Sequence, residues 1–164
     1  MKKKKLNSKT PKQSEVQMTE LVLPSHTISL GGIFGGQVMS WIDIAAAIAA
    51  QRHSEKVCVT ASVDELHFLN PIKIGYVVNI RARITAVHKT SCEVQVKVSA
   101  ENPRSGENFH TSLAYLTFVA LGENGKPSAM PPLKTQTKDE KQLEKEALIR
   151  REHRKKLKET LYDQ

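Results

Sequence analysis

Two kinds of hydrophobic spacing divide the chain. Residues 31–53, GGIFGGQVMSWIDIAAAIAAQRH, place four glycines before about seventeen residues that are mostly apolar or alanine. This segment predicts a helix that is apolar on nearly all sides and therefore needs cover on more than one of them. Residues 76–88 and 91–101 then alternate apolar and polar positions with a period of two. That alternation predicts two strands, and the two residues between them predict a hairpin.

Three further segments read as strands, at residues 17–24, 57–69 and 109–121. The order of one strand, a long helix and four strands predicts an α+β fold, in which an antiparallel sheet of about five to six strands wraps around one central helix. The alanines at 45–47, 49 and 50 keep that helix thin, so the strands can approach it closely. A single sheet has two open edges and an uncovered far face, which favours self-association.

The two ends of the chain differ in composition from its middle. Residues 1–16 are rich in lysine and are expected to be disordered. Residues 17–133 form the predicted domain, and residues 134–164 read as a charged helical extension that packs lightly on the domain or frays. The net charge of +8 divides into +4 for residues 1–20, +3 for residues 134–164 and +1 for the rest. The basic charge therefore lies in the tails, which argues against a folded nucleic-acid-binding face.

The composition narrows the class of protein further. The 164 residues suffice for one compact domain. No apolar run reaches the ~20 residues that span a bilayer, and no hydrophobic region follows the basic N-terminus, so neither membrane insertion nor a secretory signal is expected. The two cysteines, Cys58 and Cys92, lack a CxxC partner. They read as reduced core residues of a cytoplasmic protein, with no metal site.

The candidate chemistry lies where the glycines meet the helix. Asp43 interrupts the apolar run, and an ionised carboxylate there needs a partner such as Ser40, or water. The preceding GGIFGG lets the backbone approach a ligand closely and leaves free N–H groups at the helix start. Such N–H groups can polarise a carbonyl oxygen. A carbonyl-polarising loop beside a carboxylate is the minimum set for hydrolysing an activated acyl group.

Four segments in this order resemble the hotdog-fold acyl-CoA thioesterases. They are TELVLPSHTISLGGIFGGQVMSWIDIAAAIAAQRH, VCVTASVDELHFLNPIKIGYVVNIRARI, SCEVQVKVSAENPRSGE and LAYLTFVALGENGKP, and the likeness covers residues 19–133. The resemblance implies a homo-oligomer, in which two hotdog protomers pair through their sheets and three dimers commonly form a hexamer. It also implies hydrolysis of acyl-CoA to free fatty acid and CoA, at a site between protomers. Neither a metal nor a cofactor is implied, because coenzyme A is part of the substrate and product.

The resemblance also implies roles for individual residues. Gly35, Gly36 and Asp43 match the family's spacing of glycines and aspartate. The backbone N–H of Gly36, with that of Gln37, would hold the thioester carbonyl, and Asp43 would act as general base. Further substrate contacts are expected from the following residues: Phe34, Thr60, Ser62 and Arg104. Arg104 could meet the CoA phosphates or simply belong to a hairpin turn.

One position departs from the family pattern. Many relatives carry asparagine where this chain has Ile28, and that amide helps to position substrate or water. A nearby polar side chain could substitute, and the candidates are His26, Thr27, Ser29 and Thr60. The departure otherwise favours an alternative function, a non-catalytic acyl-CoA-binding protein or sensor. A hotdog dehydratase ranks lower, because no histidine precedes Gly35 at the expected place.

Overall fold

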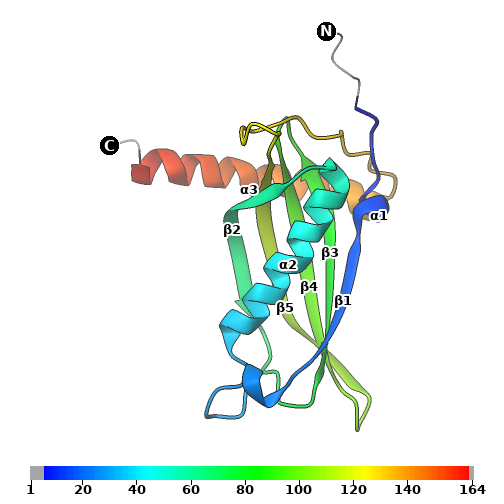
Figure 1. Ribbon diagram of the computed structural model, residues 1–164, viewed down its shortest axis with the longest axis vertical. Helices are drawn as coiled ribbons and strands as arrows, with labels where there is room; N and C mark the ends of the chain where they lie inside the picture. The colour runs from blue at the N-terminus through cyan, green and yellow to red at the C-terminus, as the bar shows by residue number, and fades with distance from the viewer. Residues whose placement is uncertain (1–5, 163–164) are drawn as a thin grey trace.

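A five-stranded antiparallel sheet curls around one long helix, and a second long helix crosses the outer face of the sheet (Figure 1). The computed structural model describes residues 6–162, apart from the side chain of Glu65. The elements in chain order are α1 (Pro11–Ser14), β1 (Val16–Leu21), η1 (Pro24–His26), α2 (Gly35–Ser54), β2 (Cys58–Phe68), β3 (Val77–Val87), β4 (Ser91–Asn102), β5 (Glu107–Ala120) and α3 (Lys138–Tyr162). The α+β class and the sheet wrapped around a helix are therefore confirmed.

The strand order is β1-β3-β4-β5-β2, so β1 and β2 are the edges. The alternation predicted for β3 and β4 is observed, because Ile80 lies opposite Val98 with both side chains buried. β2 is less regular, since its register against β5 shifts between Thr60 and Ser62 and again between Val63 and Glu65. Such bulges re-aim side chains and are common at sheet edges beside active sites.

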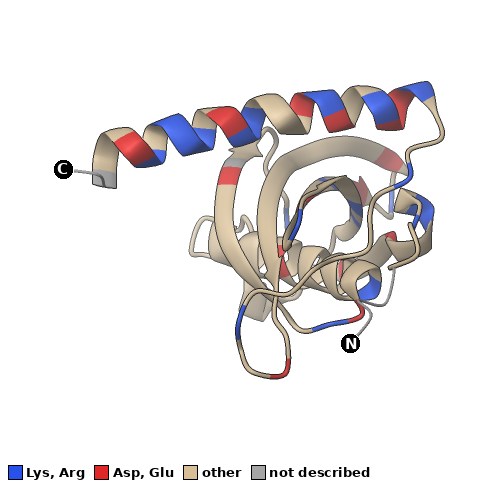
Figure 2. Ribbon diagram, turned by 90° about the horizontal axis from the view of Figure 1, so that it is seen from above, with Lys and Arg blue, Asp and Glu red and all other residues tan. Residues whose placement is uncertain are grey.

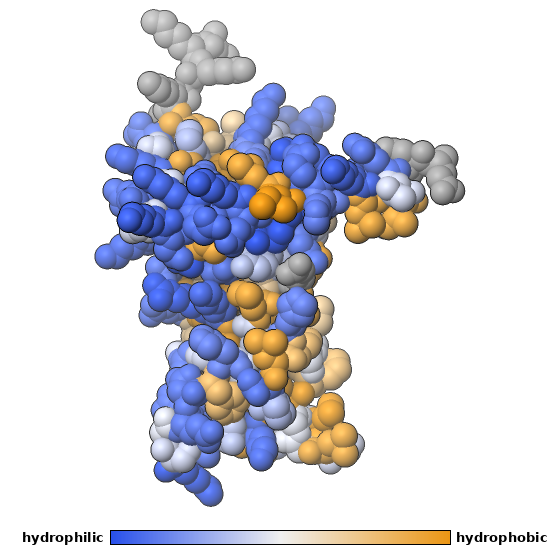
Figure 3. Space-filling model, turned by 180° about the vertical axis from the view of Figure 1, so that it is seen from behind, coloured by the Kyte–Doolittle hydropathy of each residue, from blue (hydrophilic) through white to orange (hydrophobic). Residues whose placement is uncertain are grey.

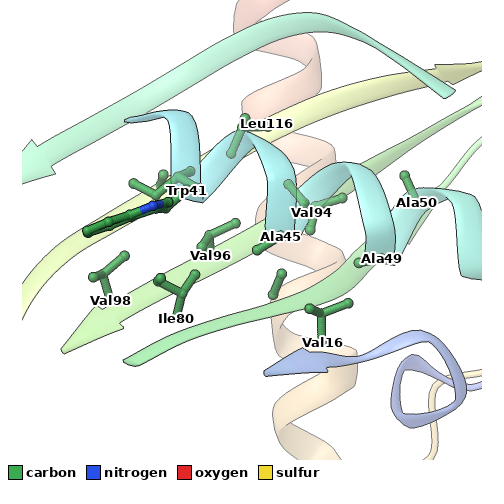
Figure 4. Close-up of a cluster of buried hydrophobic side chains, with 14 of the residues drawn as sticks. Val16, Trp41, Ala45, Ala49, Ala50, Ile80, Val94, Val96, Val98 and Leu116 are labelled. Carbon is green, nitrogen blue, oxygen red and sulfur yellow. The ribbon is translucent and has the colours of Figure 1, made fainter. Parts of the chain in front are cut away.

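The core lies between α2 and the concave face of the sheet. Ala45 and Ala49 of α2 face Val94 and Val96 of β4, and all four are fully buried (Figure 4). The small alanine side chains allow this close packing, as the sequence predicted. The helix is nevertheless not covered on all sides, because Met39 and Ile44 remain 46% exposed. The curved sheet thus covers much of the helix as expected, and the side that carries Met39 and Ile44 stays open in a single protomer.

The expected disorder of residues 1–16 is wrong for residues 6–16, while residues 1–5 lie outside the described part. Lys9 runs beside the segment before α3, donating its N–H to Pro132 O (2.9 Å) and accepting from Lys134 N–H (2.9 Å). The buried Ser14 then ends α1. Backbone pairing and burial therefore order a segment whose lysine content suggested disorder.

A buried histidine fastens this N-terminal segment to the end of α2. The side chain of His53 is fully buried, with Nε2 2.9 Å from Pro131 O and Nδ1 3.5 Å from Ser14 Oγ. Burial lowers the pKa of His53 below its ordinary value of 6.5, because the imidazolium would lose its hydration. His53 is therefore neutral in the folded protein near pH 7.

This burial predicts a loss of stability in mild acid. The unfolded chain takes up a proton at its histidine near pH 6.5 while the folded chain does not, so the free energy of unfolding falls as the pH drops below that value. The slope from one such group approaches ~1.4 kcal/mol per pH unit. Denaturant unfolding between pH 7 and pH 5 should show a shallower decline for His53→Gln than for the wild type. The exposed-site control His153→Gln should keep the wild-type decline, and an unchanged slope in His53→Gln would contradict the assignment.

The C-terminal helix packs more firmly than the light contact predicted. Leu143 and Ala147 are buried against the domain. Arg150 donates two hydrogen bonds to the carboxylate of Glu93 on β4 (2.7 and 3.1 Å) and lies 3.7 Å from the ring centre of Tyr115 on β5. Figure 2 shows the charged bands of α3 lying along the outer side of the curved sheet. These charged contacts anchor an extension whose sparse apolar residues suggested weak docking.

Two compositional expectations can be compared with the structure. Cys58 and Cys92 are both buried and free, which confirms them as reduced core residues. None of the helices in residues 6–162 is long and apolar enough to cross a membrane. The cytoplasmic location stays a prediction.

Candidate active site

The first turn of α2 presents an unused backbone donor. Phe34 caps the helix, and Gly35 and Gly36 are its first two residues. The N–H of Gly36 has no hydrogen-bond partner among the described residues, as the first turn of a helix allows. The N–H of Gln37 donates to Phe34 O (2.9 Å), so it is not free to join Gly36 in holding a carbonyl. A side chain at Gly36 would collide with the exposed ring of Phe34.

Asp43 lies two turns further along α2 and is half-buried. Its Oδ1 accepts a hydrogen bond from Thr60 Oγ1 on β2 (2.7 Å), instead of the bond to Ser40 considered from the sequence. Its Oδ2 has no partner within the described residues. One carboxylate oxygen is thus held in place, and the other is available to a water molecule.

Gly36 and Asp43 open onto one cleft between α2, β2 and β5. The cleft has a volume of about 290 Å³. Its lining is mostly apolar and consists of Gly36, Met39, Ser40, Ile42, Asp43, Val63, Leu66, Ala114 and Leu116. No histidine lines it among the described residues, which disfavours the dehydratase alternative. An apolar cleft with one carboxylate and one free N–H suits an acyl chain joined to a reactive carbonyl.

The spacing of the two groups limits how one protomer can use them. Asp43 lies seven positions after Gly36, which is ~10 Å along a helix rising 1.5 Å per residue. A water within ~3 Å of the base must also lie within ~3.5 Å of the carbon it attacks. With a further ~3 Å from the oxyanion to its N–H donor, these distances together reach at most ~10 Å, so both groups of one helix could serve a single thioester only in a fully extended arrangement, whereas groups of two facing helices are not limited in this way.

Of the other predicted site residues, the structure places one beside Asp43 and the rest elsewhere. Thr60 lies at Asp43, as expected of a residue beside the reacting group. Ser62 lies on the outer face beyond the first β2 bulge, where it donates to Asp64, and is not beside Asp43. Gly35 lines a neighbouring groove with Ile28 and Phe68. Arg104 is exposed in the β4–β5 turn, at the end of the sheet where α2 begins (Figure 1), and its phosphate contact stays a prediction.

The surroundings of Ile28 narrow the candidates for a substitute amide. The side chain of Ile28 is 45% exposed. Thr27 already donates to Pro24 O (2.8 Å), and His26 accepts from Leu23 N–H while its ring meets Trp41 edge-on. Thr60 remains the polar side chain that contacts Asp43.

Sequence reasoning missed part of the lining. Leu66 and Ala114 join the cleft because they lie opposite each other on β2 and β5 with inward-facing side chains. The alternation of β5 could have placed Ala114 on the inner face together with Leu116. The two β2 bulges left no signal in the spacing, so the outward turn of Ser62 could not be predicted.

Comparison with known proteins identifies the family of the chain. The family model described as "Thioesterase superfamily" matches residues 30–107. The chain is 40% identical over 144 residues to the uncharacterised acyl-CoA thioester hydrolase YkhA of Bacillus subtilis, covering 88% of this chain and 84% of that protein. The chain belongs to the hotdog-fold acyl-CoA thioesterases.

Solved structures of this family superpose closely on the chain. An apo-hexameric acyl-CoA thioesterase is 39% identical with a TM-score of 0.89, covering 92% of this chain and 97% of that one. The acyl-CoA hydrolase from Staphylococcus aureus, in complex with butyryl coenzyme A, coenzyme A and coenzyme A disulfide, is 34% identical with a TM-score of 0.86. That match covers 92% of each chain.

Proposed function

We propose that this thioesterase hydrolyses acyl-CoA to a free fatty acid and coenzyme A at the cleft between Gly36 and Asp43. The observation that carries the proposal is that Asp43, held by Thr60, opens onto an apolar cleft that also reaches the first turn of α2, where the N–H of Gly36 can serve the facing site of a second copy. The coenzyme A complex of the S. aureus hydrolase supports this substrate class. The reaction uses groups of the chain itself, and coenzyme A enters as part of the substrate.

Asp43 acts as the general base. Its Oδ2, which has no partner in residues 6–162, takes a proton from a water molecule, and the resulting hydroxide attacks the thioester carbon. Thr60 keeps the carboxylate oriented by binding Oδ1. When the tetrahedral intermediate collapses, the carbon–sulfur bond breaks and the departing thiolate receives the proton from Asp43. A general base of this kind contributes ~10²–10⁴-fold to the rate.

Gly36 stabilises the negative charge that forms on the carbonyl oxygen. Its N–H has no partner among the described residues, and it lies at the positive end of the α2 dipole. Loss of one oxyanion donor typically costs ~10²–10³-fold in rate. The apolar side chains around it exclude water and strengthen this interaction.

A second copy completes the site. Exposed apolar side chains gather on the open edge and on the uncovered face of α2, and they are Phe34, Met39, Ile44, Val59, Val63 and Phe68. Burial of this surface by a second copy at the β2 edge would bring two α2 helices together. Each site would then combine Asp43 of one protomer with Gly36 of the other, which agrees with their separation along α2. The hexameric relative supports assembly of such dimers into a hexamer.

The proposed activity is tested by thiol release from acyl-CoA esters of increasing chain length. The apolar cleft of about 290 Å³ predicts release of free coenzyme A that depends on acyl length. Ile28 gives the second candidate function, an acyl-CoA-binding protein without turnover. Tight binding of acyl-CoA with no thiol release at any length would favour that alternative.

Thr60→Val is expected to lower kcat about 10–100-fold with little change in KM. Valine keeps the shape of threonine but loses the hydrogen bond to a charged group, worth about 1.5–3 kcal/mol. Structures of S. aureus hydrolase variants with alanine at an aspartate and at a threonine have been solved. In this chain an aspartate and a threonine, Asp43 and Thr60, are joined by a hydrogen bond. Steady-state thiol release should show recovery in Thr60→Ser, which restores the hydroxyl. Equal kcat values for Thr60→Val and the wild type would rule out the positioning role.

A further inference from the structure

The end of α3 extends past the edge of the sheet. Within the described residues, the ion pair of Arg154 with Asp64 on β2 is the last one that joins α3 to the sheet. Residues 155–162 continue the helix for ~12 Å at 1.5 Å per residue. Figures 1 and 2 both show this end projecting beyond β2. We call residues 155–162 the α3 arm.

The arm continues the same side of α3 that packs on the sheet. The sheet-facing residues are Leu143, Ala147, Arg150 and Arg154. Their spacings of four, three and four define one side of a helix, and Leu157 and Leu161 extend that series by three and four. Leu143 is 8% exposed, whereas Leu157 and Leu161 are 59% and 57% exposed. The same helix side is thus buried over the sheet and bare beyond it.

The bare side of the arm faces a hollow at the open edge. A groove of about 600 Å³ lies between the arm and β2, with Leu157 and Thr160 on one wall and Ser62, Val63 and Asp64 on the other. Figure 3 shows hydrophobic surface on the underside of the projecting end. β2 is an outermost strand of the sheet, and its Val63 is 50% exposed.

We propose that the α3 arm docks on a second copy of this chain across the β2 edge. The proposal rests on the pairing at that edge that is part of the proposed function. α3 crosses β2 at Asp64, close to the middle of the strand Cys58–Phe68. If a second copy related by twofold symmetry pairs at this edge, its α3 also crosses its β2 near the middle of the strand, so the two α3 helices lie at the same height along the shared edge. Leu157 and Leu161 of each arm then pack against the arm and the β2 edge of the other copy, and the groove is filled from both sides.

The direction of the leucines favours a second copy over a lipid surface. Leu157 and Leu161 extend the sheet-facing side, so they point toward the place of the next strand. Leu148 and Ile149 are also exposed, at 48% and 60%, but they lie on the opposite side of α3. Leu148 and Ile149 therefore provide a matched control, because they are similarly hydrophobic but point away from the side of α3 that faces the sheet.

The test is sedimentation velocity of the full chain over a dilution series. Leu157→Asp/Leu161→Asp should raise the dissociation constant between the two copies at least about a hundredfold, because each copy would lose two leucines buried at the interface. Leu148→Asp/Ile149→Asp should keep the wild-type constant. Circular dichroism should show both variants folded. At concentrations where the dimer persists, the arm variant should release thiol at the wild-type rate, because the arm does not line the cleft.

Several results would overturn the proposal. An unchanged constant in the arm variant would remove the arm from the interface while leaving pairing at the β2 edge intact. Dissociation of a hexamer to dimers instead of monomers would place the arm at another interface. Binding of wild type, but not of the arm variant, to phosphatidylcholine–phosphatidylserine vesicles would assign the leucines to a lipid surface. A wild-type chain that is monomeric throughout would contradict the pairing itself, and with it the inference.

Discussion

Asp43→Asn is expected to lower kcat/KM for acyl-CoA hydrolysis by ~10²–10⁴-fold. Asparagine has the shape of aspartate and can still accept the hydrogen bond from Thr60, so the variant removes the base while keeping the packing. The mass of the oligomer and the unfolding midpoint should therefore stay at their wild-type values. Thiol release and sedimentation, measured on the same preparations, check both statements.

The control for this experiment is Asp139→Asn, which changes a carboxylate on the outer face of the molecule. Asp139 is 67% exposed and pairs with Arg83 at 2.9 Å, and neither residue lines the cleft. Its activity should equal that of the wild type. Full activity in Asp43→Asn would remove Asp43 from the role of base, even if the chain remains a thioesterase.

Arg150→Ala is expected to have the largest effect on stability. The guanidinium neutralises Glu93, whose side chain is 3% exposed and also accepts a hydrogen bond from Thr85 (2.6 Å). Removing one partner of a buried ion pair leaves an uncompensated charge and costs about 3–5 kcal/mol. Denaturant unfolding at fixed protein concentration should show this loss as a lower midpoint.

Two further variants distinguish the loss of the buried ion pair from a general weakening of the packing of α3. Arg151 is the neighbouring residue and pairs loosely, at 3.9 Å, with the exposed Glu152, so Arg151→Ala should cost less than about 0.5 kcal/mol. The double change Arg150→Met/Glu93→Leu replaces the pair with apolar groups and should recover most of the stability. Equal losses for Arg150→Ala and Arg151→Ala would contradict the role assigned to Glu93.

The elements with a clear period were predictable from the sequence. Ile80 and Val98 alternate with polar neighbours, and they lie opposite each other with buried side chains. The alanines of α2 correctly indicated a helix packed closely on a sheet. The local period was sufficient for these elements, because the geometry of a helix or strand by itself fixes which face each of its side chains lies on.

The remaining features depend on contacts between distant segments. Residues 6–16 are ordered in part by backbone hydrogen bonds that join Lys9 to Pro132 and Lys134, more than a hundred residues later in the chain. Arg150 and Arg154 of α3 find their acidic partners on β4 and β2, which no spacing within α3 reveals. In the site, Asp43 was predictable as an isolated charge in an apolar helix, and its bond to Thr60 depends on how β2 lies against α2.

The central claim is that each active site combines Asp43 of one protomer with Gly36 of another. Two variants test it, Asp43→Ala and Gly36→Pro, because proline removes the N–H in the first turn of a helix and the exposed ring of Phe34 can turn away from the added side chain. Each variant alone should be inactive. Co-expressed with different tags, they form mixed dimers in which one of the two sites has both wild-type groups. Since half of the random dimers are mixed, thiol release should return to about a quarter of the wild-type rate. Mixed dimers, verified by tandem purification, that remain as inactive as the two parents would show that each site lies within one protomer.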